Sequence, residues 1–151
     1  MFDKTAIDRD YATYGAFLLR TALGLMWISH AGLKYFVFGM DGFGQFLASQ
    51  GLPSFMAWPV VLIEVVGGLA ILIGVYARQV ALALTPVMAV AMWTHLPNGW
   101  VFNAQGGGWE YPAFLLVTSV ALLLIGDGAF AIRRAGLDFS SPARKRPILA
   151  A

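Results

Sequence analysis

Four long apolar stretches constrain this sequence more than any other feature, because each approaches the length that a membrane-spanning helix requires. Such a helix needs roughly 20 predominantly apolar residues. We place the four spans at about 14–36, 56–76, 79–96 and 111–125. A soluble domain is about 25% charged, whereas this chain is 12% charged and 59% hydrophobic. The sequence therefore predicts an all-α fold: one integral membrane domain, residues 1–151, in which four transmembrane helices form a bundle.

Composition also excludes several classes of protein. The apolar content excludes an intrinsically disordered chain, and a formal net charge of +2 gives no broad basic surface for nucleic acid. The chain has no cysteine, so it has neither a disulfide nor a redox-active thiol of its own. A redox role therefore depends on a bound cofactor or a small-molecule carrier.

The distribution of basic residues predicts the orientation in the membrane. With four spans, the tails (residues 1–13 and 127–151) and the short turn near Arg78 share one side. That side carries Lys4, Arg9, Arg78, Arg133, Arg134, Arg144, Lys145 and Arg146. The other side carries Lys34, at a helix end. Because basic loops stay in the cytoplasm, we expect a multi-pass protein of the bacterial inner membrane with both termini cytoplasmic.

A short helix is predicted in the first outer loop. Asp41 is placed to cap it, and Gly51 and Pro53 are placed to end it. Phe43, Phe46 and Leu47 fall on one face of this helix. We therefore expect it to lie in the outer membrane interface with its aromatic face toward the lipid.

Ionisable residues inside the predicted spans are costly and need an explanation. Arg20, His30 and Lys34 share one helical stripe of the first span with Trp27, so this stripe is expected to face the bundle interior. Glu64 lies in the second span, on the order of 12 Å below its outer end and level with His30. His95 and Glu110 occupy the outer ends of the third and fourth spans, so the polar groups gather in the outer half of the bundle.

Each of these residues also has a structural interpretation. Long side chains at helix ends can extend to the interface or to headgroups, which applies to Lys34, Glu110 and Arg20. His95 can end its helix through a hydrogen bond, and Glu64 can pair with His30 or Lys34. Tryptophans at this depth often form an interfacial belt, which applies to Trp27, Trp93, Trp100 and Trp109.

An ordered set of short motifs runs along the chain. It begins with Leu18-Leu-Arg20-Thr-Ala-Leu-Gly24 and continues with His30 and Lys34. Then follow Gly51-Leu-Pro53, Glu64-Val-Val-Gly-Gly68, Gly74 with Arg78, His95-Leu-Pro-Asn-Gly99 and Gly-Gly-Trp-Glu110-Tyr111. In this order and spacing the chain resembles the DoxX family from about Tyr14 to Ile132. One departure is Ala31, where such proteins often have a glycine directly after the histidine.

The resemblance implies a four-helix membrane protein that is an oxidoreductase or a subunit of one. Relatives have been linked to thiosulfate oxidation coupled to quinone, and to resistance against thiol, oxidative or quinone-like stress. The expected function is therefore a redox subunit that binds quinone or quinol in the outer half of the bundle, in electron transfer or stress defence. The expected partners are membrane lipid and either further copies of the chain or other subunits of a membrane redox complex.

Specific roles follow from this hypothesis. His95 and His30 would hydrogen-bond the quinone oxygens and Glu64 would accept or deliver protons, which makes these three the candidate catalytic residues. The candidate cofactor-binding residues are Trp27, Lys34, Trp93, Asn98, Trp100, Glu110 and Arg20. Trp27, Trp93 or Trp100 would supply a wall on which the ring stacks. No metal site is predicted.

Three alternatives remain open at this point. The polar cluster can be a structural network in a non-catalytic membrane anchor or scaffold of a larger complex. It can also be the binding cavity of a small-molecule permease, which at 151 residues would need to oligomerise. A b-type haem between the two histidines is the least favoured of the three.

The orientation is directly testable. Alkaline phosphatase is active only in the periplasm. When it is fused after Ala151 it should show no activity, because the basic tail keeps the C-terminus in the cytoplasm. The matched fusion in the second outer loop, after Gln105, should be active. Activity of the first fusion would invert the topology.

Overall fold

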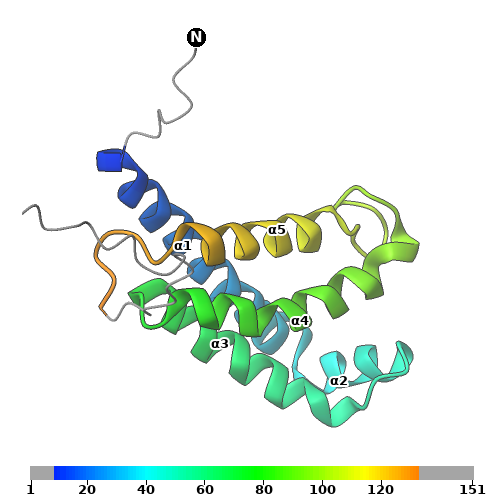
Figure 1. The fold of residues 1–151 in the computed structure, drawn as a ribbon. Helices are drawn as coiled ribbons and strands as arrows, with labels where there is room; N and C mark the ends of the chain where they lie inside the picture. The colour runs from blue at the N-terminus through cyan, green and yellow to red at the C-terminus, as the bar shows by residue number, and fades with distance from the viewer. Residues whose placement is uncertain (1–8, 133–151) are drawn as a thin grey trace, which may run out of the picture.

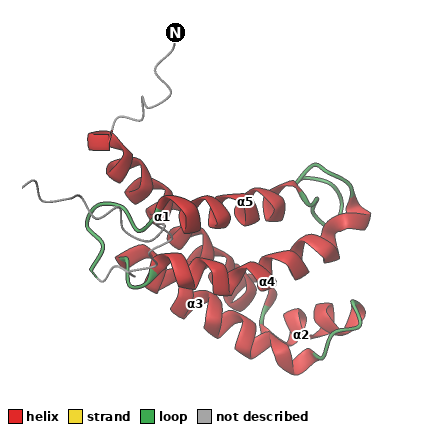
Figure 2. Cartoon of the chain, in the orientation of Figure 1, coloured by secondary structure: helices red, strands yellow, loops and turns green. Residues whose placement is uncertain are grey.

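The computed structural model describes residues 9–132, and these are helices joined by short loops, with no strand among them (Figures 1 and 2). The principal helices are α1 (Arg9–Gly32), α2 (Met40–Ser49), α3 (Ala57–Ile73), α4 (Ala77–His95) and α5 (Glu110–Ile125). Three short elements complete the fold: the π-helix η1 (Leu33–Phe38) and the 3₁₀ helices η2 (Ser54–Met56) and η3 (Leu96–Asn98). The all-α prediction is confirmed for this part of the chain.

Helices α1, α3, α4 and α5 form one bundle, and α2 lies apart beside the start of α3 (Figure 1). The closest pairings are α1 with α3 and α4 with α5. Three segments are long and apolar enough to cross a membrane: Tyr11–Phe38, Ser54–Ile73 and Ala77–Asn98. The fourth predicted span corresponds to α5, which has 16 residues and is apolar but shorter.

Two apolar clusters hold the fold together. The main cluster lies between the four bundle helices and includes Leu23, Trp27, Ile71, Leu84 and Leu122, each at most 2% exposed. The second lies under α2 and consists of Ala31, Phe43, Leu47, Ala57 and Val61. The helix that stands apart in Figure 1 is thus attached to the bundle through Phe43 and Leu47.

A helix, α2, occurs in the first loop as predicted, but Asp41 does not cap it, and Phe43 and Leu47 of its apolar face are buried against the bundle rather than turned to lipid. The N-cap is Gly39 at φ 70°, and Asp41 lies exposed in the first turn without a side-chain capping bond. The helix ends at Ser49, just before Gly51 at φ 76°. Residues 39 and 51 both have a positive φ, which glycine tolerates and other residues rarely adopt.

Glycine allows the close crossing of α1 and α3. A Cβ on Gly24 would lie 2.9 Å from the carbonyl oxygen of Gly68 and 2.8 Å from the backbone nitrogen of Leu72. Because both neighbours are backbone atoms, a side chain at this position would push the two helices apart. The Gly67-Gly68 pair of the Glu64–Gly68 motif therefore has a packing role.

The chain that follows α5 fastens the opposite end of the bundle. The backbone nitrogen of Ala129 donates to the carbonyl of Thr13 at 2.9 Å, and that of Ile132 donates to the carbonyl of Ile73 at 3.3 Å. The buried carboxylate of Asp127 accepts a 3.0 Å bond from the backbone nitrogen of Arg78, in the first turn of α4. Residues 127–132, predicted as the start of a tail, thus return to the helices; residues 133–151 lie outside the described part of the chain.

The glycine crossing predicts a stability difference within one helix. Gly24→Ala should lower the free energy of unfolding by about 1–3 kcal/mol, because its methyl group meets backbone atoms of α3. Gly15→Ala is the matched control, since nothing lies within 4 Å of a Cβ there. That variant should be neutral or stabilised by up to about 1 kcal/mol. Unfolding in detergent, followed by circular dichroism, compares the two; equal effects would contradict the packing argument.

Candidate functional site

The most deeply placed charge of the bundle is Glu64, and it forms an ion pair with Lys34. The Glu64 side chain is 0% exposed and the Lys34 side chain is 18% exposed. Lys34 belongs to the π-helix η1 that continues α1, whereas Glu64 lies in the middle of α3. A buried ion pair survives in apolar surroundings because each charge satisfies the other. Of the partners considered for Glu64, the structure assigns Lys34.

The ion pair is covered by α2. The Nζ atom of Lys34 lies 5.4 Å from the centre of the Phe43 ring, within the range of a cation–π contact. The second carboxylate oxygen of Glu64, Oε2, is buried and has no hydrogen-bond partner among the described residues. An unpartnered buried oxygen is costly and marks a place for a further donor.

His30 contacts the first turn of α5. Its ring stacks on Tyr111 with the centroids 5.1 Å apart and the planes inclined by 23°. The Tyr111 hydroxyl is buried and has no hydrogen-bond partner in the described structure, and the same holds for the indole nitrogen of Trp27. His30 lies one helical turn before Lys34 in α1 and one turn after Trp27. Helices α1, α3 and α5 thus bring titratable groups together in this half of the bundle.

A groove of about 460 Å³ opens beside the same turn of α5. It is lined mainly by apolar atoms, from Trp100, Glu110, Tyr111, Ala113, Phe114 and Val117. Positions 110, 113, 114 and 117 follow the helical repeat, so the groove runs along one face of α5. Its polar groups lie at the start of the helix. Phe114 and Val117, further along, are 64% and 66% exposed.

His95 and Asn98 organise the loop between α4 and α5, predicted as the second outer loop. His95 Nδ1 lies 3.1 Å from the carbonyl oxygen of Gly106, and Asn98 Nδ2 donates to the same oxygen at 2.9 Å. The His95 ring also stacks on Phe46 of α2, with 6.5 Å between centroids. The structural interpretation of His95, a hydrogen bond at a helix end, is therefore the observed one. Glu64 and His95, predicted to share one cavity, have separate sets of partners.

Glu110 and Trp100 hold the end of this loop against α5. Glu110 Oε1 accepts a 2.9 Å bond from the backbone nitrogen of Phe102, so the carboxylate is engaged within the protein rather than extended into the interface. The backbone nitrogen of Glu110 donates to the carbonyl of Trp100 at 3.0 Å. The Trp100 ring packs edge-on against Trp109, with the centroids 4.4 Å apart. Both predicted residues line the groove on α5.

The other three predicted residues occupy different environments. Arg20 is 1% exposed and its Nη2 donates to the carbonyl of Ala129 at 3.0 Å, at the end of the bundle away from α2. Its guanidinium faces the bundle, as the helical stripe predicted, but it is not part of the Glu64 cluster. Trp27 is 1% exposed inside the main core, whereas Trp93 is 53% exposed on α4. Neither tryptophan lines the groove.

Comparison with known proteins decides the family. The DoxX family model matches residues 15–97, more than half of the chain. The chain belongs to the DoxX family. It is also 38% identical over 120 residues to a Bacillus subtilis protein named "Putative oxidoreductase CatD", a match that covers 78% of this chain and 84% of that protein. No solved structure matches. With its apolar helices, this DoxX chain is a membrane protein.

The DoxX match extends over the ion pair but ends before the groove. His30, Lys34, α2, Glu64 and His95 lie within residues 15–97, and Tyr111 lies beyond them. No set of three His, Cys, Asp or Glu side chains suited to a metal ion occurs among the described residues of this DoxX protein.

Sequence reasoning did not single out Tyr111, Phe43 as a cation–π partner, or Asp127. Tyr111 carried a signal, because it follows Glu110 directly and begins an apolar helix. Phe43 was placed on the aromatic face of the outer helix, but nothing local to the sequence joins it to Lys34. Asp127 and Arg78 are 49 residues apart, a contact that only the tertiary fold reveals.

The ion pair predicts a rescue experiment in this DoxX protein. Lys34→Met should destabilise the protein by on the order of 3 kcal/mol, because it leaves the Glu64 carboxyl buried without its counter-charge. Adding Glu64→Gln should restore most of that loss, because the neutral amide removes the buried charge. Denaturant unfolding of the two single variants and the double variant forms a complete cycle. Additive losses would show that the two groups do not interact.

Proposed function

We propose that this membrane protein is a quinone-linked redox subunit, with the quinone or quinol ring held in the groove on α5. One observation carries the proposal: Tyr111 lines the groove and also stacks on His30, which lies one turn from the Lys34–Glu64 pair. An apolar ring slot therefore adjoins a row of titratable side chains. The name of the Bacillus subtilis relative, an oxidoreductase, agrees in reaction class.

The groove suits an amphiphilic ring with a hydrocarbon tail. Its volume of about 460 Å³ lies within the usual range of ligand pockets, about 300–1,000 Å³. Trp100 gives an aromatic face and Glu110 a carboxylate at the helix start, whereas the Tyr111 hydroxyl is itself buried. Phe114 and Val117 extend the groove toward the middle of the predicted span, where an isoprenoid tail would lie in the bilayer.

The titratable row supplies what proton-coupled redox chemistry requires. Quinone reduction and quinol oxidation move protons together with electrons, and the ring oxygens need partners that both donate and accept. Tyr111 lines the groove and His30 stacks on it, and under this proposal the two side chains would hydrogen-bond the ring oxygens and pass protons, with Glu64 Oε2 as a further acceptor. Because the chain has no cysteine, the electrons pass to or from a partner subunit or a carrier.

The proposal includes the full membrane topology. We treat α5 as the fourth span: its 16 residues measure about 24 Å, and Trp109 lies at its outer end as an interfacial anchor. The end with α2 then faces outward from the bacterial inner membrane and both termini lie in the cytoplasm. In that placement α2, with its buried Phe43 and Leu47, lies in the outer interface.

A membrane anchor without chemistry of its own is the second candidate. The hydrogen bonds of His95, Asn98 and Glu110 within the second outer loop favour it, because they give these polar groups a structural role. Under this alternative the protein would dock a separate enzyme and retain no quinone.

Quinone affinity separates the two candidates. Trp100→Ala in detergent-purified protein should weaken binding of a decyl-tailed benzoquinone by roughly 3–10-fold, because it removes the ring wall. Trp58→Ala is the matched control, since Trp58 is 61% exposed on α3 and does not line the groove. Equilibrium dialysis of the labelled quinone gives both affinities. The absence of binding by the unmodified protein, or equal losses in both variants, would favour the anchor.

A further inference from the structure

Helix α2 lies between two glycines that could act as hinges. It is ten residues long and is flanked by Gly39 and Gly51, which have φ of 70° and 76°. Nothing lies within 4 Å of a Cβ at either glycine, so both positions have free space around them. Hinges are commonly a few residues at element ends that absorb large backbone changes. Of its side chains, Phe43 and Leu47 are buried.

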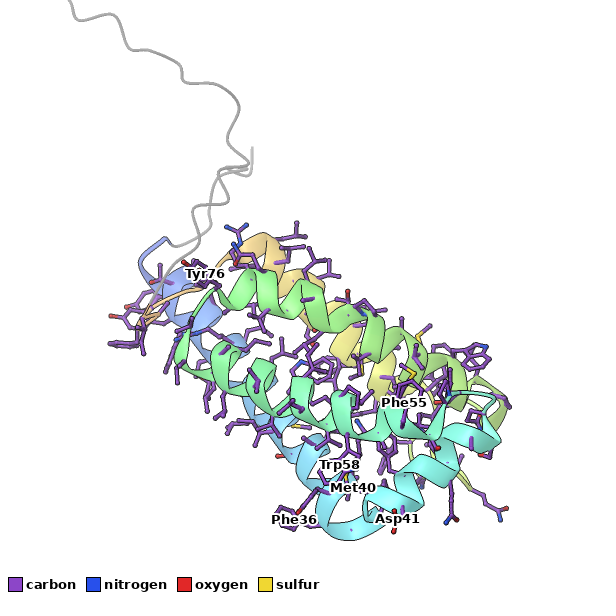
Figure 3. All side chains as sticks on the ribbon, turned by 90° about the horizontal axis from the view of Figure 1, so that it is seen from below. Phe36, Met40, Asp41, Phe55, Trp58 and Tyr76 are labelled. Atoms are coloured by element: carbon purple, nitrogen blue, oxygen red, sulfur yellow. The ribbon has the colours of Figure 1, made fainter. Side chains whose placement is uncertain are left out.

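Helix α2 covers the Lys34–Glu64 ion pair on the side where the bundle helices do not enclose it. Phe43 lies over the ammonium group of Lys34. The Lys34 side chain is 18% exposed, whereas that of its partner Glu64 is fully buried. In Figure 3, Met40 and Asp41 at the start of α2 lie near Phe36 and Trp58, at the α2 end of the bundle. Displacing α2 would therefore uncover Lys34 first and Glu64 behind it.

The backbone beneath α2 is also adapted to movement. Lys34 lies in the six-residue π-helix Leu33–Phe38, whose hydrogen-bond pattern is less regular than that of an α-helix and is often found at functional sites. The segment ends at Gly39, where α2 begins. A rotation of α2 about Gly39 would thus act directly on the segment that carries Lys34.

We propose that α2 is a cover that opens an aqueous port to Glu64 through Lys34. With α2 closed, Lys34 holds the Glu64 carboxylate and Phe43 shields the ammonium group. With α2 lifted, Lys34 turns toward water, and the Glu64 carboxylate accepts a proton from a hydronium ion, which becomes water; release of the proton to water is the reverse step. The titratable groups on the surrounding elements are His30 on α1, Tyr35 on η1, Asp41 on α2, His95 on α4, which stacks on Phe46 of α2, and Tyr111 on α5, which stacks on His30. The proposal does not depend on a quinone, so it stands or fails separately from the proposed function.

A disulfide lock tests the cover. A Cβ on Gly44 lies 3.5 Å from the Cβ of Ser54, at the short end of the range that a disulfide spans. Gly44→Cys with Ser54→Cys would therefore fix α2 to the residues that precede α3. Because the chain has no cysteine, no other disulfide can form within it. The two single-cysteine variants are the controls.

The readout is the labelling of Glu64 by a water-soluble carbodiimide with glycinamide, measured by mass spectrometry. The oxidised double variant should be labelled about tenfold more slowly than the same protein after reduction, because local opening limits access to the carboxyl. Glu110, which lies outside α2, serves as an internal reference and should be labelled equally in both forms. Equal labelling of Glu64 in both forms would show that α2 is a static part of the fold.

A second pair of variants tests the cover without a disulfide. Phe43→Ala removes the ring over Lys34 and should raise the labelling of Glu64 by about tenfold, because a loosely packed helix opens more often. Gln45→Ala is the matched control on the same helix, since Gln45 is exposed, whereas Phe46 stacks on the Phe43 ring itself. Faster labelling in Phe43→Ala alone supports the port. Unchanged labelling in Phe43→Ala overturns it.

Discussion

A carboxylate inside an apolar bundle is the constraint on which this fold depends. Glu64 is fully buried in α3, and a charge in that position destabilises the protein unless a counter-charge reaches it. Lys34 provides that charge from η1, which continues α1, and the glycine crossing at Gly24 and Gly68 brings α1 close to α3. Helix α2 then covers the side that remains open. Three helical elements, η1, α2 and α3, thus meet around one buried ion pair.

The polar groups at the α2 end of the bundle fall into two sets: an outer set in the loop between α4 and α5, and an inner set buried between the helices. His95, Asn98 and Glu110 form hydrogen bonds with backbone groups of the loop between α4 and α5. Glu64 Oε2, the Tyr111 hydroxyl and the Trp27 indole nitrogen are buried without partners in the described structure. Buried polar groups are usually satisfied, and those that are not are often explained by an additional bound molecule. The chemistry we propose therefore belongs to the inner set and to the groove beside Tyr111.

Much of the fold could be predicted from the sequence, because span positions depend on local hydropathy. The inward direction of Arg20 followed from the helical repeat in the same way. The partners of the polar groups could not be predicted. Glu64 had two candidate cations, and the choice of Lys34 depends on the π-helix and the placement of α2, neither of which is a local property. The bonds to Gly106 depend on the path of a glycine-rich loop, and the Tyr111–His30 stack depends on how α5 approaches α1.

The chain that follows α5 has a consequence for biosynthesis. Residues 127–132 supply the carbonyl for Arg20, the cap for α4 and backbone bonds to Thr13 and Ile73. During translation, α1, α3 and α4 emerge before any of these partners exists. The hydrogen bond from Arg20 Nη2 to the carbonyl of Ala129 can therefore form only after α5 has been synthesised. Completion of the fold is therefore a late event, and a chain that ended within α5 would lack the contacts of residues 127–132 with Thr13, Ile73 and Arg78.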